Sequence, residues 1–147
     1  MPNRKFRIAL AACAMVLACG AEEKPASPDL DVEDAWVRAA TAGSNSAAYL
    51  TVHNSGQAPD RLLGSSADFA TATELHRTTI DEAGMALMGR VEGLDLAAGS
   101  TAVLEPGSYH LMLMGVTRDL TEGETVSLVL EFETAGPVTV HAEVRSF

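Results

Sequence analysis

Apolar and polar residues alternate over short segments from residue 32 to the end of the chain, which is the pattern of strands with one buried face. Gly, Asn, Asp, Ser and Pro separate these segments, as expected for turns. A helical period never extends over more than about ten residues without a Gly or Pro interruption. The pattern therefore predicts an all-β domain, an antiparallel β-sandwich or barrel. We expect strands over 32–38, 47–53, 61–66, 72–79, 86–91, 101–104, 110–114, 125–133 and 138–144.

The start of the chain breaks this pattern. Three basic residues within the first seven positions precede an apolar run over 8–18, which ends at Cys19. A basic start followed by an apolar run too short to span a bilayer is typical of an export signal that is cut off. We therefore expect residues 1–18 to be a signal peptide and not part of the fold.

Cys19 is the expected site of lipidation. An aliphatic residue three places before it and a small residue directly before it resemble the bacterial lipoprotein signal, in which the Cys becomes the lipidated first residue. The lipid would anchor the protein to the membrane on the periplasmic side of the cell envelope. Two alternatives stay open, which are processing at Cys13 and simple signal cleavage near Ala21.

The rest of the chain divides into a tether and a domain. Residues 19–31 are rich in Ala, Glu, Pro and Ser and have no apolar period, so we expect the lipidated Cys to be followed by a flexible tether. The folded domain is then expected over 32–147. We expect it to be a monomer.

The charge balance limits the partners. The chain has 20 acidic and 10 basic residues and a formal net charge of −10. Three of the basic residues lie in the expected signal, so the exported part is relatively more acidic still. Such a surface has no basic stripe that can replace the counterions of nucleic-acid phosphates, and we expect no nucleic-acid partner.

Both cysteines, Cys13 and Cys19, fall in the expected signal and anchor. The domain therefore has no disulfide, no cysteine-type zinc site and no thiol nucleophile. The glycine-flanked serine of hydrolases and the paired His and Glu of hydrolytic zinc enzymes are also missing from the sequence. We therefore expect that the protein is not an enzyme. Any chemistry of the domain must come from His, Met or carboxylate side chains.

The methionines are concentrated beside histidines. Outside the expected signal they occur only at positions 85, 88, 112 and 114, with His76 and His110 in or beside this window. A single Met is ordinarily core filler. In the segment 109–114, however, strand alternation places Tyr109, Leu111 and Leu113 on one face and His110, Met112 and Met114 on the other.

Imidazole and thioether together have a chemical preference. Thioether sulfur is a soft, neutral ligand that favours Cu(I) over Zn(II), Mg(II) and Ca(II). A blue-copper electron-transfer centre needs a cysteine thiolate, which this domain lacks. The His and Met residues therefore point to Cu(I) binding without the electron-transfer role.

The spacing of these residues resembles a known family. His76 is followed by Arg77, ten residues, Met88, twenty-one residues, His110, one residue and Met112. This is the motif of the periplasmic copper chaperones of the PCu(A)C family, except that the family often has Met where Arg77 stands. Further segments that look like the family are 34–38, 48–54, 74–76, 91–93 and 106–115.

The resemblance implies a fold, a ligand set and a task. The implied fold is a cupredoxin-like antiparallel β-sandwich with Greek-key connections, and the implied task is to deliver Cu(I). The recipient would be the dinuclear copper A site of a cytochrome c oxidase subunit, reached directly or through a thioredoxin-like copper assembly protein. The implied Cu(I) ligands are His76, Met88, His110 and Met112.

Five other residues are expected to have structural roles. We expect Met114 in the core, with a spare ligand on the same strand face as the alternative. We expect Met85 as a loop side chain that shields the site, His53 and His141 as ordinary strand histidines, and Trp36 as a core anchor. Two other functions stay open. One is a copper buffer or resistance lipoprotein, and the other is an envelope lipoprotein module that binds no metal.

Overall fold

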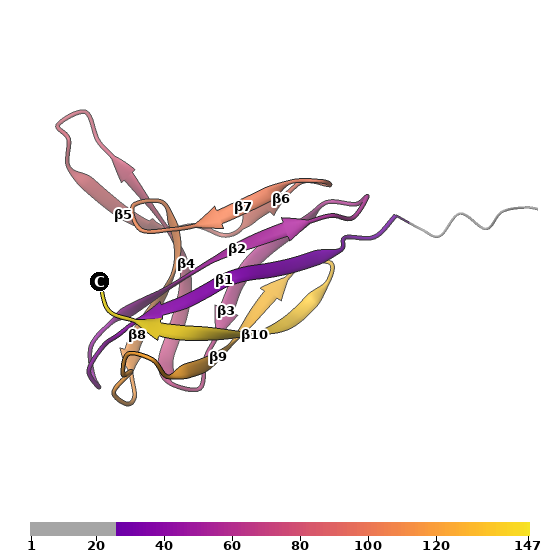
Figure 1. Ribbon diagram of the computed structural model, residues 1–147. Helices are drawn as coiled ribbons and strands as arrows, with labels where there is room; N and C mark the ends of the chain where they lie inside the picture. Colours follow the sequence, from indigo (N-terminus) through magenta and orange to yellow (C-terminus); the bar gives the residue numbers. More distant parts are fainter. Residues whose placement is uncertain (1–25) are drawn as a thin grey trace, which may run out of the picture.

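The computed structural model describes residues 26–147, which form strands joined by turns and loops (Figure 1). The expected signal peptide over 1–18, the lipidation site Cys19 and the first part of the tether lie outside the described residues. Among residues 26–147, no helix is present that could cross a membrane.

Ten strands pair into one sheet that curves round to enclose the core. Their order across the sheet is β5-β4-β8-β7-β2-β1-β10-β9-β3-β6, and all pairs are antiparallel except β1 with β10 and β7 with β8. The strands are β1 (Leu30–Arg38), β2 (Ser46–Asn54), β3 (Asp60–Ser66), β4 (Ala70–Ile80), β5 (Ala86–Arg90), β6 (Leu94–Leu96), β7 (Thr101–Leu104), β8 (Tyr109–Val116), β9 (Thr125–Phe132) and β10 (Gly136–Arg145).

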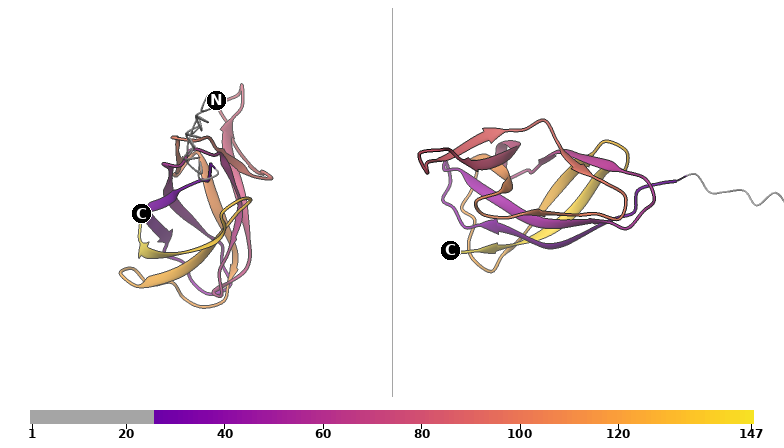
Figure 2. Two further views of the ribbon diagram at one scale, coloured as in Figure 1. Left: turned by 90° about the vertical axis from the view of Figure 1, so that its right-hand side faces the viewer. Right: turned by 90° about the horizontal axis from the view of Figure 1, so that it is seen from above.

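The two halves of the sheet face each other as the layers of a β-sandwich (Figure 2). Strands β3 and β4 are not hydrogen-bonded neighbours, yet they pack against each other and close the sandwich. The predicted all-β sandwich is confirmed, and the arrangement is cupredoxin-like. The core combines alternate side chains from both layers, among them Leu50, Leu75, Leu111, Leu128 and Leu130, each at most 2% exposed.

Trp36 is not the core anchor that we expected. Asp34 has a positive φ of 51°, and the pairing of β1 with β2 shifts register between Glu33 and Trp36. This β-bulge adds one residue and reverses the alternation, so that Val37 is fully buried while Trp36 faces outward. The indole ring instead packs on Tyr49, with 4.4 Å between ring centres.

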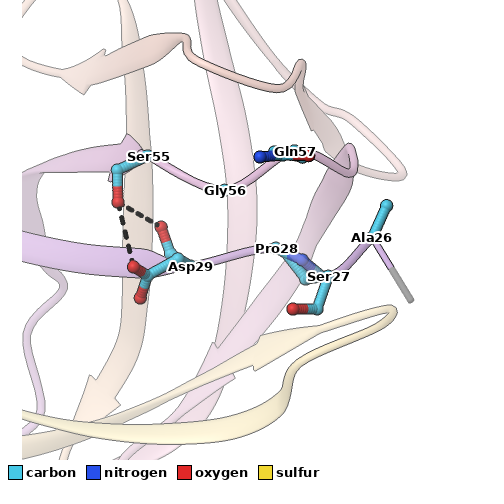
Figure 3. Close-up of a pocket in the computed structure, with 7 residues that line it drawn as sticks. All are labelled: Ala26, Ser27, Pro28, Asp29, Ser55, Gly56 and Gln57. Atoms are coloured by element: carbon cyan, nitrogen blue, oxygen red, sulfur yellow. Dashed lines mark hydrogen bonds between the residues drawn. The ribbon is translucent and has the colours of Figure 1, made fainter. Parts of the chain in front are cut away.

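The folded part begins earlier than expected. Strand β1 starts at Leu30, and the preceding residues pair with the loop that follows β2 (Figure 3). The backbone N–H of Ser55 donates to the carbonyl of Asp29 at 2.8 Å, and that of Gln57 donates to the carbonyl of Ser27 at 3.2 Å. Residues 27–31 therefore belong to the fold and not to the expected tether.

Gly56 permits this close pairing. A Cβ at this position would lie 2.4 Å from the backbone nitrogen of Asp29 and 2.4 Å from the carbonyl oxygen of Ser27. Such contacts with backbone atoms cannot be relieved by rotating a side chain. The segment enters the fold at the end of the molecule that lies far from the β4–β5 hairpin (Figures 1 and 2).

Candidate metal centre

Strands β4 and β8 place His76 directly opposite His110. Both side chains lie on the outer face of the sheet, because the neighbouring Leu75 and Leu111 fill the core. The two ring centres are 5.8 Å apart and the rings are inclined at 64°. With imidazole–metal bonds of about 2.1 Å, two rings on one ion have centres at most about 6.4 Å apart. The observed separation therefore allows both rings to bind the same ion.

Met112 is the next residue on this face of β8. It pairs with Glu74 of β4 on one side and with Ala47 of β2 on the other. Leu111 and Leu113, which flank it, are fully buried. The predicted alternation along β8 is therefore confirmed, and it brings a thioether next to the histidine pair.

Met114 is not in the core. It is half-buried, lies outside the core cluster and shares the outer face of β8 with His110 and Met112. The core face of this part of β8 is taken by Leu111 and Leu113. Our expectation of a core position for Met114 is therefore wrong.

Met88 reaches the same face from the edge strand β5. It pairs with Thr78, while Arg90 of β5 pairs with His76, and directly paired residues point to the same side of a sheet. The side chain of Met88 is 64% exposed. Met85, in the turn of the same hairpin, is 60% exposed. Three of the four predicted ligands thus lie on the adjacent strands β4 and β8, and the fourth lies on the projecting β4–β5 hairpin (Figure 1).

His110 is only 4% exposed, although it lies on the outer face. The ring of Tyr49 on β2 lies 6.4 Å from the ring of His110 between centres. The ring of His76 lies on β4, the neighbouring strand on the other side. Burial raises the pKa of the Tyr49 phenol, an effect that the positive charge of Arg38 partly offsets. The phenol is therefore neutral at physiological pH, and it covers the histidine without adding charge.

Sequence reasoning assigned no role to Glu74, which lies in contact with His76. One of its carboxylate oxygens, Oε2, is 2.9 Å from Nε2 of His76. The other, Oε1, is 3.6 Å from a guanidinium nitrogen of Arg90. The signal in the sequence was the spacing of two between Glu74 and His76, which places both on one face of a strand.

The other two histidines lie on other strands, away from the pair of His76 and His110. His53 of β2 contacts Thr101 Oγ1 through Nδ1 at 2.8 Å and Glu33 through Nε2 at 3.2 Å. His141 of β10 contacts the hydroxyl of Ser127 at 3.2 Å. Each has a polar neighbour of its own.

The donor groups around the histidine pair are the two imidazoles, the neighbouring thioethers and the carboxylate of Glu74, which already contacts Nε2 of His76. In the described part of the chain, no group of three or more His, Cys, Asp or Glu side chains is arranged to hold a metal. Imidazole and thioether are neutral donors, and the thioether adds a preference for a soft ion such as Cu(I).

The fold and this face together define a domain of the PCuAC class. The copper-bound PCuAC domain from PmoF2 matches with a TM-score of 0.67 and 28% identity over 80% of this chain and 93% of that chain. The Cu(I) form of DR1885 from Deinococcus radiodurans matches with a TM-score of 0.58 and 31% identity over 87% and 83% of the two chains.

The sequence comparisons give the family. Residues 30–144 match the family described as "Putative lipoprotein LpqE-like", and the chain belongs to it. A "Putative lipoprotein" of Leifsonia xyli subsp. xyli is 31% identical over 95% of this chain and 84% of its own length. The family resemblance inferred from the spacing of His76, Met88, His110 and Met112 is thereby confirmed.

Proposed function

We propose that this protein is an exported metallochaperone that binds Cu(I) through His76, Met88, His110 and Met112. The observation that carries the proposal is the cross-strand pair of His76 and His110, whose ring centres are 5.8 Å apart with Met112 as the next residue on the same face. Similarity to a copper-bound PCuAC domain and to the Cu(I) form of DR1885 supports it.

The ligand arrangement suits transfer of the ion rather than turnover. Four neutral ligands leave Cu(I) with its single positive charge, and thioethers bind Cu(I) without the charge of a thiolate. Met88 lies on the exposed edge strand, so an incoming ligand reaches this side of the ion first. Replacement of Met88 would begin the transfer, and the buried His110 would leave last.

The proposed recipient is the copper A site of cytochrome c oxidase, reached directly or through a thioredoxin-like assembly protein. Support for this recipient comes from the resemblance of the His and Met motif to the copper chaperones. The proposed location is the periplasmic side of the envelope, with a lipid on Cys19. The described chain starts at Ala26, at the end of the molecule far from the β4–β5 hairpin (Figure 1).

A competition titration tests the binding. The protein is the full chain with Cys13→Ser and Cys19→Ser, so that no thiol competes for Cu(I). This variant, here called the thiol-free chain, is kept in detergent. Under reducing conditions it should take one equivalent of Cu(I) from a coloured chelator, and a His76→Leu, His110→Leu double variant should take none. Equal uptake by both proteins would contradict the proposal, and no uptake by the first would favour a module that binds no metal.

A transfer experiment separates a chaperone from a copper buffer. The Cu(I)-loaded thiol-free chain is mixed with the metal-free copper A domain of an oxidase subunit or with a reduced thioredoxin-like assembly protein. Movement of copper to either acceptor faster than from a chelator of equal affinity supports delivery. Retention of copper in the presence of both acceptors would favour a buffer or resistance protein.

A further inference from the structure

We propose that Glu74 is a positioning residue that makes the two histidines bind Cu(I) through different ring nitrogens, His76 through Nδ1 and His110 through Nε2. The inference rests on the proposed Cu(I) binding and adds the geometry of the ligands. It depends on which nitrogen of each ring carries the proton in the metal-free protein.

For His76 the proton is assigned by Glu74. Nε2 of His76 lies 2.9 Å from Oε2 of Glu74, and a carboxylate oxygen can only accept a hydrogen bond. A ring that binds a metal has to be neutral, so its single proton is on Nε2 and its lone pair is on Nδ1. The side chains of His76 and Glu74 are 17% and 28% exposed, so water competes only weakly for this hydrogen bond.

An ion pair links the carboxylate of Glu74 to the edge strand β5. Its second oxygen, Oε1, lies 3.6 Å from Nη1 of Arg90, which is the residue paired with His76 on β5. On the opposite side Glu74 pairs with Met112 of β8. The carboxylate is therefore linked to the edge strand that carries Met88 through the largely exposed side chain of Arg90, and its contact with Nε2 orients the ring of His76.

For His110 the proton is assigned by the backbone. Nδ1 of His110 lies 3.2 Å from the carbonyl oxygen of Ser108, which also can only accept. Nδ1 therefore carries the proton, and Nε2 is the nitrogen free to bind a metal. The two rings thus present different nitrogens, although they lie opposite each other on neighbouring strands.

A hydrogen bond from the far nitrogen of a metal-binding imidazole to a carboxylate orients the ring and strengthens it as a ligand, and its loss typically lowers metal affinity about 10- to 100-fold. We expect that loss for Glu74→Ala. Glu74→Gln keeps an oxygen that accepts from Nε2, so it should retain most of the affinity. Glu33 provides a matched control, because it makes the same contact with Nε2 of His53, at 3.2 Å, away from His76 and His110.

The test is nitrogen-15 NMR of the histidine side chains in the thiol-free chain, with the imidazole nitrogens labelled. In the metal-free protein, couplings to the ring protons should report the proton on Nε2 of His76 and on Nδ1 of His110. Added Cu(I), under reducing conditions, should shift the signals of Nδ1 of His76 and Nε2 of His110. In Glu74→Ala the signals of His76 should show a mixture of the two tautomers, while Glu33→Ala should leave both ligand rings unchanged.

The outcomes are distinguishable. Cu(I) bound through Nε2 of His76, or a metal-free His76 that carries its proton on Nδ1, would overturn the role of Glu74 and leave the Cu(I) site standing. A folded Glu74→Ala protein in which the tautomer of His76 and the Cu(I) affinity are unchanged would also overturn the role of Glu74 and leave the Cu(I) site standing. Unshifted signals of both His76 and His110 at saturating Cu(I) would overturn the proposed function, and the inference with it.

Discussion

The ring of Tyr49 lies 6.4 Å from the ring of His110, between centres, and covers an imidazole that alternation along β8 places on the outer face. Trp36 packs on the other side of Tyr49 at 4.4 Å, and the C-terminal Phe147 packs edge-on against Trp36 at 5.6 Å. A row of aromatic rings therefore runs from the histidine pair across β2 and β1 to the end of the chain.

Shortening Tyr49 should expose His110. In Tyr49→Ala we expect weaker Cu(I) binding, and stability lower by about 3–5 kcal/mol, because a buried aromatic ring is lost. Tyr49→Phe keeps the ring and should bind Cu(I) as the wild type does. Chelator competition and urea unfolding measure the two effects, and equal weakening in both variants would assign the effect to the hydroxyl instead of the ring.

The two methionines of β8 should differ. Met112 pairs with Glu74 beside the histidine pair, whereas Met114 pairs with Ala72 further along the strand. Met112→Leu keeps the size of the side chain and removes the sulfur, so it should lower Cu(I) affinity by more than the factor of about 10–100 that an outer hydrogen-bond partner contributes. Met114→Leu should change it little. Equal losses in the two variants, measured by chelator competition, would remove the assignment of Met112 as the ligand.

Acid should destabilise the protein through Asp60. Asp60 is 6% exposed, and its carboxylate accepts hydrogen bonds from the backbone N–H groups of Arg61 at 2.7 Å, Thr134 at 2.8 Å and Ala135 at 2.9 Å. Burial raises the pKa of Asp60, but these hydrogen bonds outweigh it and hold the pKa below the ordinary value of 3.8. The stabilisation is therefore complete above the pKa of the unfolded chain and is lost as the pH falls through the lower pKa of the folded protein.

Asp60→Asn tests this account. At neutral pH we expect a loss of about 1–3 kcal/mol, because the amide group cannot accept from every N–H that the carboxylate now satisfies. The difference between the variant and the wild type should shrink as the pH falls through the acidic range in which Asp60 takes up its proton. Urea unfolding at several pH values measures it, and a difference that is constant with pH would contradict the assignment.

Gly56→Ala should release the segment that precedes β1. The added Cβ would lie 2.4 Å from backbone atoms of Asp29 and Ser27, so the hydrogen bonds to Ser55 and Gln57 cannot persist unchanged. We expect the amides of Ser55 and Gln57 to exchange with solvent about fivefold faster, since one backbone hydrogen bond contributes about 1 kcal/mol.

Gly64→Ala is the control for this change, because a Cβ at position 64 would meet nothing within 4 Å. Cu(I) affinity should be unchanged in Gly56→Ala, since Gly56 packs against residues 27–29, and this segment enters the fold at the end of the molecule far from the β4–β5 hairpin (Figure 1). Slow amide exchange at Ser55 in Gly56→Ala would show that the loop adapts without releasing the segment.

The part of the site on β8 could be predicted from the sequence because it depends on local alternation. The two-residue period of a strand alone assigns His110 and Met112 to one face of β8 and Tyr109, Leu111 and Leu113 to the other. The partners of this strand could not be derived from alternation, since pairing depends on contacts between residues far apart in the chain. That His76 and His110 lie close together was implied only by the resemblance of the whole motif spacing to the copper chaperones.

The missed features have physical reasons of the same kind. Trp36 faces outward because of a bulge at Asp34, and a bulge is a property of two paired strands rather than of one sequence segment. Strand β6, Leu94–Leu96, is too short to show alternation and exists because it pairs with β3. Glu74 was not recognised because its role depends on where the ring of His76 points.

X-ray absorption of the Cu(I)-loaded thiol-free chain, under reducing conditions, tests the central claim most directly, because it counts sulfur and nitrogen around the ion. We expect two nitrogen and two sulfur neighbours, from His76, His110, Met88 and Met112, and one sulfur fewer in Met88→Leu or Met112→Leu. A shell of nitrogen or oxygen neighbours without sulfur, or a sulfur count that neither substitution changes, would contradict the proposed Cu(I) site.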